Sequence, residues 1–163
     1  IKLINDNEFK TIVEVGVLDG YTADNIRRFC ETVEKYYLID QWKVFESDTK
    51  KRNQDIWDVK YANACKKFED DVRFTIIRKS SIEAFELFKP NSIDLVFIDA
   101  DHSYEYCKQD IYLWHSIVSV GGILCGDDYG RAGVREAVNE AYPKKFSLMK
   151  KNRVWVVRKE NKT

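Results

Sequence analysis

The sequence has no net charge, no paired-cysteine motif and no long hydrophobic run, and each absence excludes a class of protein. Lys+Arg and Asp+Glu both number 27 in 163 residues, so no charge excess favours nucleic acid or an anionic membrane. No apolar run has transmembrane length, and no signal peptide is recognisable. The chain begins at Ile1 rather than Met, so we expect further residues before it.

The four cysteines lie far apart and form no C-x-x-C pair. Each is in an apolar or helical context. This spacing predicts small buried thiols in a reducing, cytoplasmic compartment, rather than disulfides or a zinc site. The positions are Cys30, Cys65, Cys107 and Cys125.

The residues that are present predict one folded domain over residues 1–163. Hydrophobic residues make up 44% and aromatic residues 13%, enough for a full core. The expected strands are Thr11–Val17, Tyr36–Asp40, Val72–Ile77, Ile93–Asp99, Ile123–Cys125, Lys145–Met149 and Val154–Arg158. The expected helices are Thr22–Val33, Lys51–Asp70, a short one from Ser80 or Ser81 to Phe88, one between Ser103 and Gly121-Gly122, and Val134–Tyr142. Strands that alternate with helices, followed by a hairpin, indicate an open α/β sheet, mainly parallel, with one reversed strand.

The rest of the chain is organised around the stretch from Thr11 to Thr22, TIVEVGVLDGYT. An apolar run ends in an acid–glycine turn, and an amphipathic helix begins at once. Glu14, Gly16 and Gly20 have the spacing E-x-G-x-x-x-G. Glycines let the backbone turn sharply and let a ligand come close, while the N–H groups of the next helix face that ligand.

Acidic residues cluster at the predicted carboxyl ends of three other strands. They are Asp40, Asp99, Asp101, Asp127 and Asp128. In open α/β sheets ligands bind beyond the carboxyl ends of the strands. This clustering is the main functional signal in the sequence.

Four motifs in the same order resemble class I S-adenosylmethionine-dependent methyltransferases. The resemblance covers Val13 to Val157, and it is carried by the Glu14-to-Gly20 spacing, Phe97–Tyr104 (FIDADHSY), Gly121-Gly122-Ile123 with Gly126–Tyr129 (GDDY), and Gly133–Val138. It implies an α/β Rossmann-like three-layer sandwich. The sheet would have seven mostly parallel strands, with an antiparallel C-terminal strand.

The resemblance also implies S-adenosylmethionine as cofactor and assigns its contacts by position. Glu14, Gly16 and Gly20 would face the methionine part, Asp40 would bind both ribose hydroxyls, Gln41 and Trp42 would flank the adenine, and Ser80 and Ser81 would contact its edge. A carboxylate suits the ribose because it only accepts hydrogen bonds. Two alternatives stay open: Glu14 as a structural acid, and Asp40 as a loop cap.

Asp99, Asp127 and Asp128 resemble the metal set of metal-dependent small-molecule O-methyltransferases. Three carboxylates at neighbouring strand ends repel one another unless a cation lies between them. Mg²⁺ uses oxygen ligands of this kind and would lower the pKa of an acceptor hydroxyl. Many members of the resembled group have His where Asp127 stands. Contact of Asp99 with the amino end of the cofactor is the alternative.

The proton of the acceptor would pass to Asp101 or His102. A contact of His102 with the cofactor, or a cap on the following helix, is the alternative for that residue. Ser103 is expected to be an N-cap and His115 to be structural.

The predicted function is methyl transfer to a hydroxyl of a small acceptor, of the sugar or secondary-metabolite type. Acceptor specificity is expected from the Gln41–Lys50 loop and from Tyr129–Gly133. A methyltransferase-fold module that binds the cofactor without turnover is the first alternative. An NAD-binding oxidoreductase is disfavoured, because Gly16-x-x-x-Gly20 lacks the G-x-G-x-x-G spacing.

Overall fold

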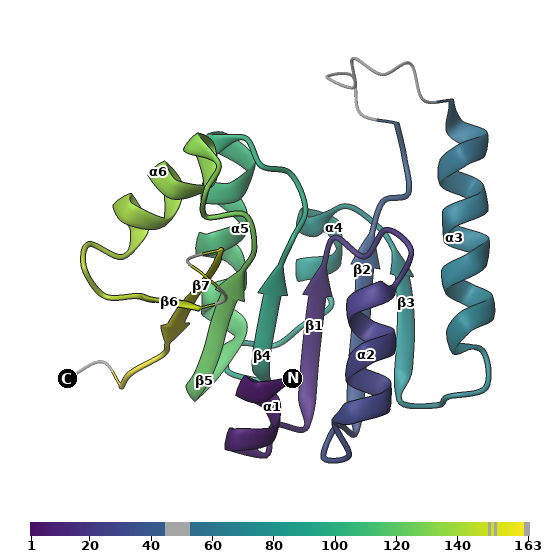
Figure 1. Cartoon of the computed structure of the whole chain (residues 1–163), viewed down its shortest axis with the longest axis horizontal. Helices are drawn as coiled ribbons and strands as arrows, with labels where there is room; N and C mark the ends of the chain where they lie inside the picture. The colour runs from purple at the N-terminus through teal and green to yellow at the C-terminus, as the bar shows by residue number, and fades with distance from the viewer. Residues whose placement is uncertain (45–52, 150, 152, 162–163) are drawn as a thin grey trace.

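A computed structural model of the chain describes residues 1–44, 53–149, 151 and 153–161. Seven strands form one sheet in the order β3-β2-β1-β4-β5-β7-β6 (Figure 1). The strands are β1 Thr11–Val15, β2 Lys35–Asp40, β3 Phe74–Arg78, β4 Ile93–Ile98, β5 Val118–Gly126, β6 Ser147–Met149 and β7 Val154–Arg158. The helices are α1 Lys2–Asn7, α2 Tyr21–Phe29, α3 Gln54–Phe68, α4 Ser81–Phe85, α5 Tyr104–Ile117 and α6 Ala132–Ala141.

The predicted three-layer α/β sandwich with a seven-stranded, mostly parallel sheet is confirmed. Strands β1 to β5 pair in parallel, and β7 pairs antiparallel with both β5 and β6. The last two strands therefore form the expected antiparallel pair, with β7 as the reversed strand. The predicted link between them at Lys150–Asn152 falls largely outside the described residues.

Two hydrophobic clusters fill the spaces on either side of the sheet. One joins residues of α1, α2 and α3 to one sheet face, and the other joins residues of α4, α5 and α6 to the opposite face. Figure 1 shows α1 and α2 in front of the strands and α4 and α5 behind them. Strand β1 contributes to both clusters, through Ile12 on one face and Val13 and Val15 on the other. A near-continuous apolar run is typical of a strand buried on both faces.

The boundaries of the first long helices differ from the sequence prediction. Helix α2 begins at Tyr21 after Gly20, which has a φ of 68°, so Thr22 is not the N-cap. Helix α3 begins after Asn53, whose side chain accepts a hydrogen bond from the Ile56 N–H. That cap satisfies one of the N–H groups that have no partner within the helix.

The pair Gly121-Gly122 does not close α5, as the sequence suggested, but lies inside β5. Helix α5 ends at Ile117, and β5 starts at the next residue. The pairing of β5 with β4 shifts register across this pair, and Gly121 has a φ of 83°. A bulge with a left-handed residue accounts for glycine here.

All four cysteines are free thiols; three are buried, and Cys65 is half-buried. No helix in the described part of the chain is both long and apolar enough to cross a membrane.

Gly16, directly after β1, lets the chain pass close to the end of β4. Its φ is 91°, and a Cβ built there would lie 2.1 Å from the Asp99 carbonyl oxygen and 2.8 Å from the Ala100 Cα. Backbone atoms cannot move aside as a flexible side chain can. Glycine is therefore required at position 16 by the approach of two strand ends, before any ligand is considered.

Gly16→Ala should destabilise the fold by about 2–5 kcal/mol, since it adds backbone strain and overpacking. Gly130→Ala is the matched control, because a Cβ at Gly130 meets no atom within 4 Å. Urea unfolding of both variants checks the difference. Equal stabilities of the two variants would contradict the assigned constraint.

Candidate functional site

The carboxyl ends of β1, β2, β4 and β5 lie side by side along one edge of the sheet. Backbone hydrogen bonds continue past the strand ends: Gly16 N–H donates to the Ile39 carbonyl at 2.8 Å, and Asp99 N–H donates to the Val15 carbonyl at 2.8 Å. The Asp127 N–H donates to the carbonyl of Ile98, the last residue of β4, at 3.2 Å. These bonds align the glycine turn with the acids that follow β4 and β5.

Helix α3 holds the glycine turn from the side. The Lys60 ammonium lies 2.9 Å from both oxygens of Asp19, and the Lys67 ammonium donates to the Asp19 carbonyl at 2.6 Å. A Cβ at Gly20 would lie 2.8 Å from the Phe68 ring. The close approach of the Phe68 ring therefore accounts for glycine at position 20. The contact of Gly20 with a cofactor stays a prediction.

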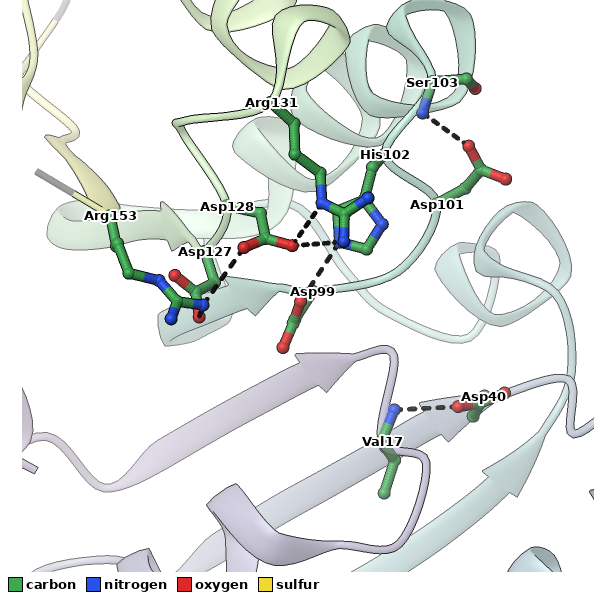
Figure 2. Close-up of polar contacts among 10 residues, drawn as sticks. All are labelled: Val17, Asp40, Asp99, Asp101, His102, Ser103, Asp127, Asp128, Arg131 and Arg153. Carbon is green, nitrogen blue, oxygen red and sulfur yellow. Dashed lines mark hydrogen bonds and ion pairs between the residues drawn. The ribbon is translucent and has the colours of Figure 1, made fainter.

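Asp40 lies at the end of β2 and caps the same turn. One carboxylate oxygen accepts hydrogen bonds from Val17 N–H at 2.9 Å and Leu18 N–H at 3.0 Å, and the other accepts from Trp42 N–H at 2.8 Å. Figure 2 shows the bond to Val17. The loop cap, kept as an alternative from the sequence, is thus present. A carboxylate accepts about four hydrogen bonds, so this cap leaves room for a further donor.

Trp42 was expected to flank the adenine, but the structure buries its ring completely. The indole N–H donates to the Leu18 carbonyl at 2.9 Å, and the ring packs against Tyr61 of α3 with centroids 5.1 Å apart. It therefore offers no ring face to a ligand and belongs to the core. Neighbouring Gln41 is half-buried, and its carbonyl accepts from Arg78 at 3.4 Å. Residues 45–50 of the predicted specificity loop lie outside the described residues.

Ser80 and Ser81 have structural partners at the start of α4. Ser80 is the N-cap and forms a capping box with Glu83. The Ser81 hydroxyl donates to Asp110 and accepts from the Trp114 indole N–H at 2.7 Å. The donor and one of the two acceptor positions of that hydroxyl are therefore used within the protein, and its contact with an adenine edge stays a prediction.

Glu14 is a buried acid that points into the core on the α2–α3 side of the sheet. Its carboxylate accepts a hydrogen bond from the Tyr36 hydroxyl at 2.8 Å. Burial raises the pKa of Glu14 from 4.5 to about 8, and the Tyr36 hydrogen bond opposes that shift. The Tyr36 ring stacks on Phe74 and Phe74 stacks on Phe68, with centroids 5.1 and 4.8 Å apart. The structural alternative for Glu14 therefore fits what the structure shows.

Asp99, His102 and Asp128 converge above the ends of β4 and β5 (Figure 2). The His102 Nε2 lies 3.6 Å from Asp99 Oδ1 and 3.1 Å from Asp128 Oδ2. This Nε2 atom is buried and has no hydrogen-bond partner among the described residues. One ligand atom from each of the three residues lies within 4.8 Å of the others, close enough to share one cation.

His102 rather than Asp127 completes this group. The Asp127 Oδ1 is buried without a hydrogen bond from any described residue, and Oδ2 is paired with Arg153 at 3.2 Å. Of the three carboxylates predicted as metal ligands, the structure therefore brings only Asp99 and Asp128 together in this group.

Two arginines provide the counter-charge that the paired acids need. Arg131 Nε lies 2.7 Å from Asp128 Oδ2, and one Arg153 terminal nitrogen lies 3.2 Å from Asp128 Oδ1. Burial raises the pKa of Asp128, but the Arg131 hydrogen bond and the charges of His102, Arg131 and Arg153 outweigh it, so the pKa is lowered. Asp128 is thus held as a carboxylate.

Asp101, predicted as a possible base, lies at the start of α5 instead. Its carboxylate accepts from the Ser103 N–H at 2.7 Å, as Figure 2 shows. Ser103 is the N-cap residue but makes no side-chain capping bond. Asp101 is not part of the group around His102, and its role as base stays a prediction.

Three contributors to the site were missed by sequence reasoning. Arg131 and Arg153 stand in polar segments without a motif, although Arg131 falls within the predicted specificity stretch 129–133. A Cβ at Gly133 would lie 2.6 Å from the His102 carbonyl oxygen, so this glycine lets the loop that carries Asp128 approach His102. Gly133 begins one of the four motifs that carry the family resemblance, but the sequence did not show why a glycine is needed there.

Comparison with known proteins agrees with the fold and identifies the family. A family profile described as a methyltransferase domain matches residues 13–129, most of the chain. The chain therefore belongs to this family of S-adenosylmethionine-dependent methyltransferases. One curated relative is an uncharacterized protein of Acanthamoeba polyphaga mimivirus, 45% identical over 40 residues. That match covers 24% of this chain and 18% of the relative.

Solved structures with low sequence identity share the fold. A putative O-methyltransferase from Klebsiella pneumoniae has a TM-score of 0.72 at 16% identity, covering 98% of this chain and 77% of that one. An O-methyltransferase from Bacillus cereus in complex with SAH has a TM-score of 0.68 at 16% identity, covering 97% and 78%. Spermidine synthase from Thermotoga maritima has a TM-score of 0.58 at 15% identity, covering 91% and 52%. The chain spans about half the length of that synthase.

The buried acid gives a pH-dependent prediction for stability. Because the pKa of Glu14 is raised in the fold, the unfolded chain releases this proton first as pH rises. The free energy of unfolding should fall from pH 4.5 until pH passes about 8. Each pKa unit is worth about 1.4 kcal/mol, so the loss amounts to a few kcal/mol.

Glu14→Gln removes this titration and keeps an acceptor for Tyr36. The variant should match the wild type at pH 4.5 and become progressively more stable than it up to about pH 8. Urea unfolding at several pH values between 4.5 and 8 measures the gap in the free energy of unfolding between the variant and the wild type. A gap that does not change with pH would show that Glu14 is not the buried titrating group.

Proposed function

We propose that the chain transfers the methyl group of S-adenosylmethionine to a hydroxyl group of a small acceptor. The observation that carries this proposal is the unsatisfied His102 Nε2 between Asp99 and Asp128, at the sheet edge that also holds Asp40. A buried nitrogen without a hydrogen-bond partner is costly in a fold, and a catalytic role or a bound ion would account for this one. The O-methyltransferases of similar fold support the same chemistry.

The residues at the edge fit the cofactor. Asp40 retains acceptor capacity at the end of β2, where the ribose is expected. Asp99 has its ion pair with His102 but accepts no hydrogen bond from the described residues, so its carboxylate suits the cofactor ammonium or a metal cation. When bound, S-adenosylmethionine supplies an electrophilic methyl group on a sulfonium. The protein must then present a reactive oxygen in line with it.

His102 is the residue we assign to activating that oxygen. Its Nε2 takes the hydroxyl proton, and the resulting imidazolium lies 3.1 Å from an Asp128 oxygen. Asp128 is held ionised by Arg131 and Arg153, so it stabilises the imidazolium as soon as it forms. Asp99 adds a second negative charge at 3.6 Å.

A divalent cation is the second candidate for the same atoms. Two carboxylates and an imidazole form a mixed donor set, which suits Mn²⁺ or Zn²⁺ as well as the Mg²⁺ expected from the sequence. In that case Asp99, His102 and Asp128 would hold the cation, which would lower the pKa of the acceptor hydroxyl when bound. The proton would then pass to another base, for which Asp101 is the candidate.

Asp40→Asn should weaken S-adenosylhomocysteine binding about tenfold or more, because a charge-assisted hydrogen bond to the ribose is replaced by a neutral one. Asp94→Asn is a matched control at the opposite edge of the sheet. Asp94 also accepts from two backbone N–H groups, of Lys10 and Thr11, both at 2.9 Å. Calorimetry with S-adenosylhomocysteine measures both variants.

Equal affinities of Asp40→Asn and Asp94→Asn would remove Asp40 from the cofactor site. A wild-type protein that binds NAD and not S-adenosylhomocysteine would favour the oxidoreductase alternative. Binding of S-adenosylhomocysteine without turnover on any acceptor would favour the binding-only module.

Metal binding is tested by Mn²⁺ and Mg²⁺ calorimetry on EDTA-treated protein, together with methyl-transfer assays. If the metal proposal holds, Asp128→Asn and His102→Gln should weaken cation binding more than Asp127→Asn does, since Asp127 is outside the group. EDTA should then stop methyl transfer and leave S-adenosylhomocysteine binding intact. Full activity in EDTA and no cation binding would leave His102 as the base.

A further inference from the structure

Arg131 and Arg153 stand at the rim of the Asp99–His102–Asp128 group and present unused hydrogen-bond donors to solvent. Their side chains are 61% and 65% exposed. Arg131 uses only its Nε, and Arg153 uses only one terminal nitrogen, on Asp127 and Asp128. The other guanidinium nitrogens of both arginines have no partner among the described residues.

Both guanidinium groups are also paired with the same carboxylate. Arg131 binds one oxygen of Asp128 and Arg153 binds the other, so both positive charges bracket a single carboxylate (Figure 2). Further donors of both groups are unpaired among the described residues, so an anion at this rim would meet guanidinium nitrogens already oriented by Asp128, which lowers the entropy cost of binding.

Neutralising the acids does not by itself account for this arrangement. Exposed ion pairs contribute about 0–1 kcal/mol to stability, and two lysines would supply the same charge. Arginine differs because its planar fork can bind a carboxylate or phosphate through two parallel hydrogen bonds while another edge remains anchored. Within the described part of the chain, Arg131, which donates through its Nε, leaves the edge formed by its two terminal nitrogens unpaired, and Arg153 leaves one terminal nitrogen and its Nε unpaired.

We infer that the acceptor carries an anionic group, a carboxylate or a phosphate, a few bonds from the hydroxyl that is methylated. This inference rests on the proposed function. Arg131 Nε and His102 Nε2 lie 2.7 and 3.1 Å from the same Asp128 oxygen. An acceptor with its hydroxyl at His102 therefore places neighbouring atoms beside the guanidinium edge of Arg131.

The charge of the cofactor favours the same acceptor class. Asp99, Asp127 and Asp128 exceed the two arginines by one negative charge, and the sulfonium of a bound cofactor would offset it. A divalent cation would make the site positive. The bound charge would thus offset the excess of acids over arginines within this group, and the positive groups at the rim would steer a negative acceptor inward.

The test uses pairs of compounds that share hydroxyl groups but differ in charge. One pair is 3,4-dihydroxybenzoate and catechol, and the other is glucose 6-phosphate and glucose. Sinefungin carries an ammonium group in place of the sulfonium and transfers no methyl group, so calorimetry on protein saturated with sinefungin measures each affinity, and methyl transfer from S-adenosylmethionine is followed in parallel. The anionic member of at least one pair should bind about tenfold or more tightly than its neutral partner. Glucuronate, which shares its sugar ring with glucose 6-phosphate, then distinguishes a carboxylate from a phosphate.

Arg131→Gln and Arg153→Gln should each reduce this preference severalfold, and Arg131→Lys should restore only part of it. Arg135→Gln is the matched control, because Arg135 lies in the first turn of α6, whose N-cap is Arg131, and donates to the Gly130 carbonyl rather than to an acid. Circular dichroism verifies that each variant is folded.

Equal affinities within both pairs, no binding of either anionic compound, or a preference that survives in both glutamine variants would overturn the inference. S-Adenosylhomocysteine binding separates the two levels of the argument. If the wild type binds it and shows no anion preference, only the acceptor class is wrong. If the wild type does not bind it, the proposed function fails as well.

Discussion

The close approach of the chain at Gly16 to the backbone at Asp99 is the constraint on which the candidate site depends. With no side chain at position 16, β1 and β4 stay paired up to their last residues, and the chain then turns away at once. The acid after β4 consequently lies beside the turn after β1. Any larger residue would separate the predicted cofactor half of the edge from the group around His102.

Helix α3 links the fold to both loops at the predicted cofactor half of this edge. It holds Asp19 through Lys60 and Lys67, and it packs Tyr61 against the buried Trp42. The turn after β1 and the loop after β2 therefore share one support. The rigidity expected of a binding site comes here from a helix that bears none of the predicted cofactor residues.

The sequence was sufficient for the sheet and for the edge at which the acids gather. Apolar runs that end in an acid or a glycine located the carboxyl ends of β1, β2 and β4, and a short link located the final hairpin. Which side chains face a ligand was harder to predict. Trp42 and Ser81 follow strands like binding residues, but Trp42 packs against Tyr61 in the core, and the half-buried Ser81 accepts a hydrogen bond from Trp114. Local patterns contain no information about such partners, which lie far away in the sequence.

Charge pairing across long separations was equally invisible. Asp127 and Asp128 suggested a metal because two adjacent acids need a positive charge, and that requirement was correct. Arg153 lies on the segment that leads into β7, 25 residues later, and only the antiparallel pairing of β7 with β5 brings it to the acids. His102 joined the group for a similar reason, since Gly133 allows two loops to touch.

Strand β1 has an aspartate cap at each of its two ends, one from each neighbouring strand. Asp94 of β4 accepts the N–H groups of Lys10 and Thr11 where the chain enters β1, and Asp40 of β2 accepts those of Val17 and Leu18 beyond its end. A slip of β1 by one residue in either direction would leave both carboxylates with mismatched donors and turn Val13 and Val15 to the wrong face. The two caps therefore act as end stops that select one register for the central strand. The same pair of aspartates fixes how far the glycine turn projects beyond the sheet.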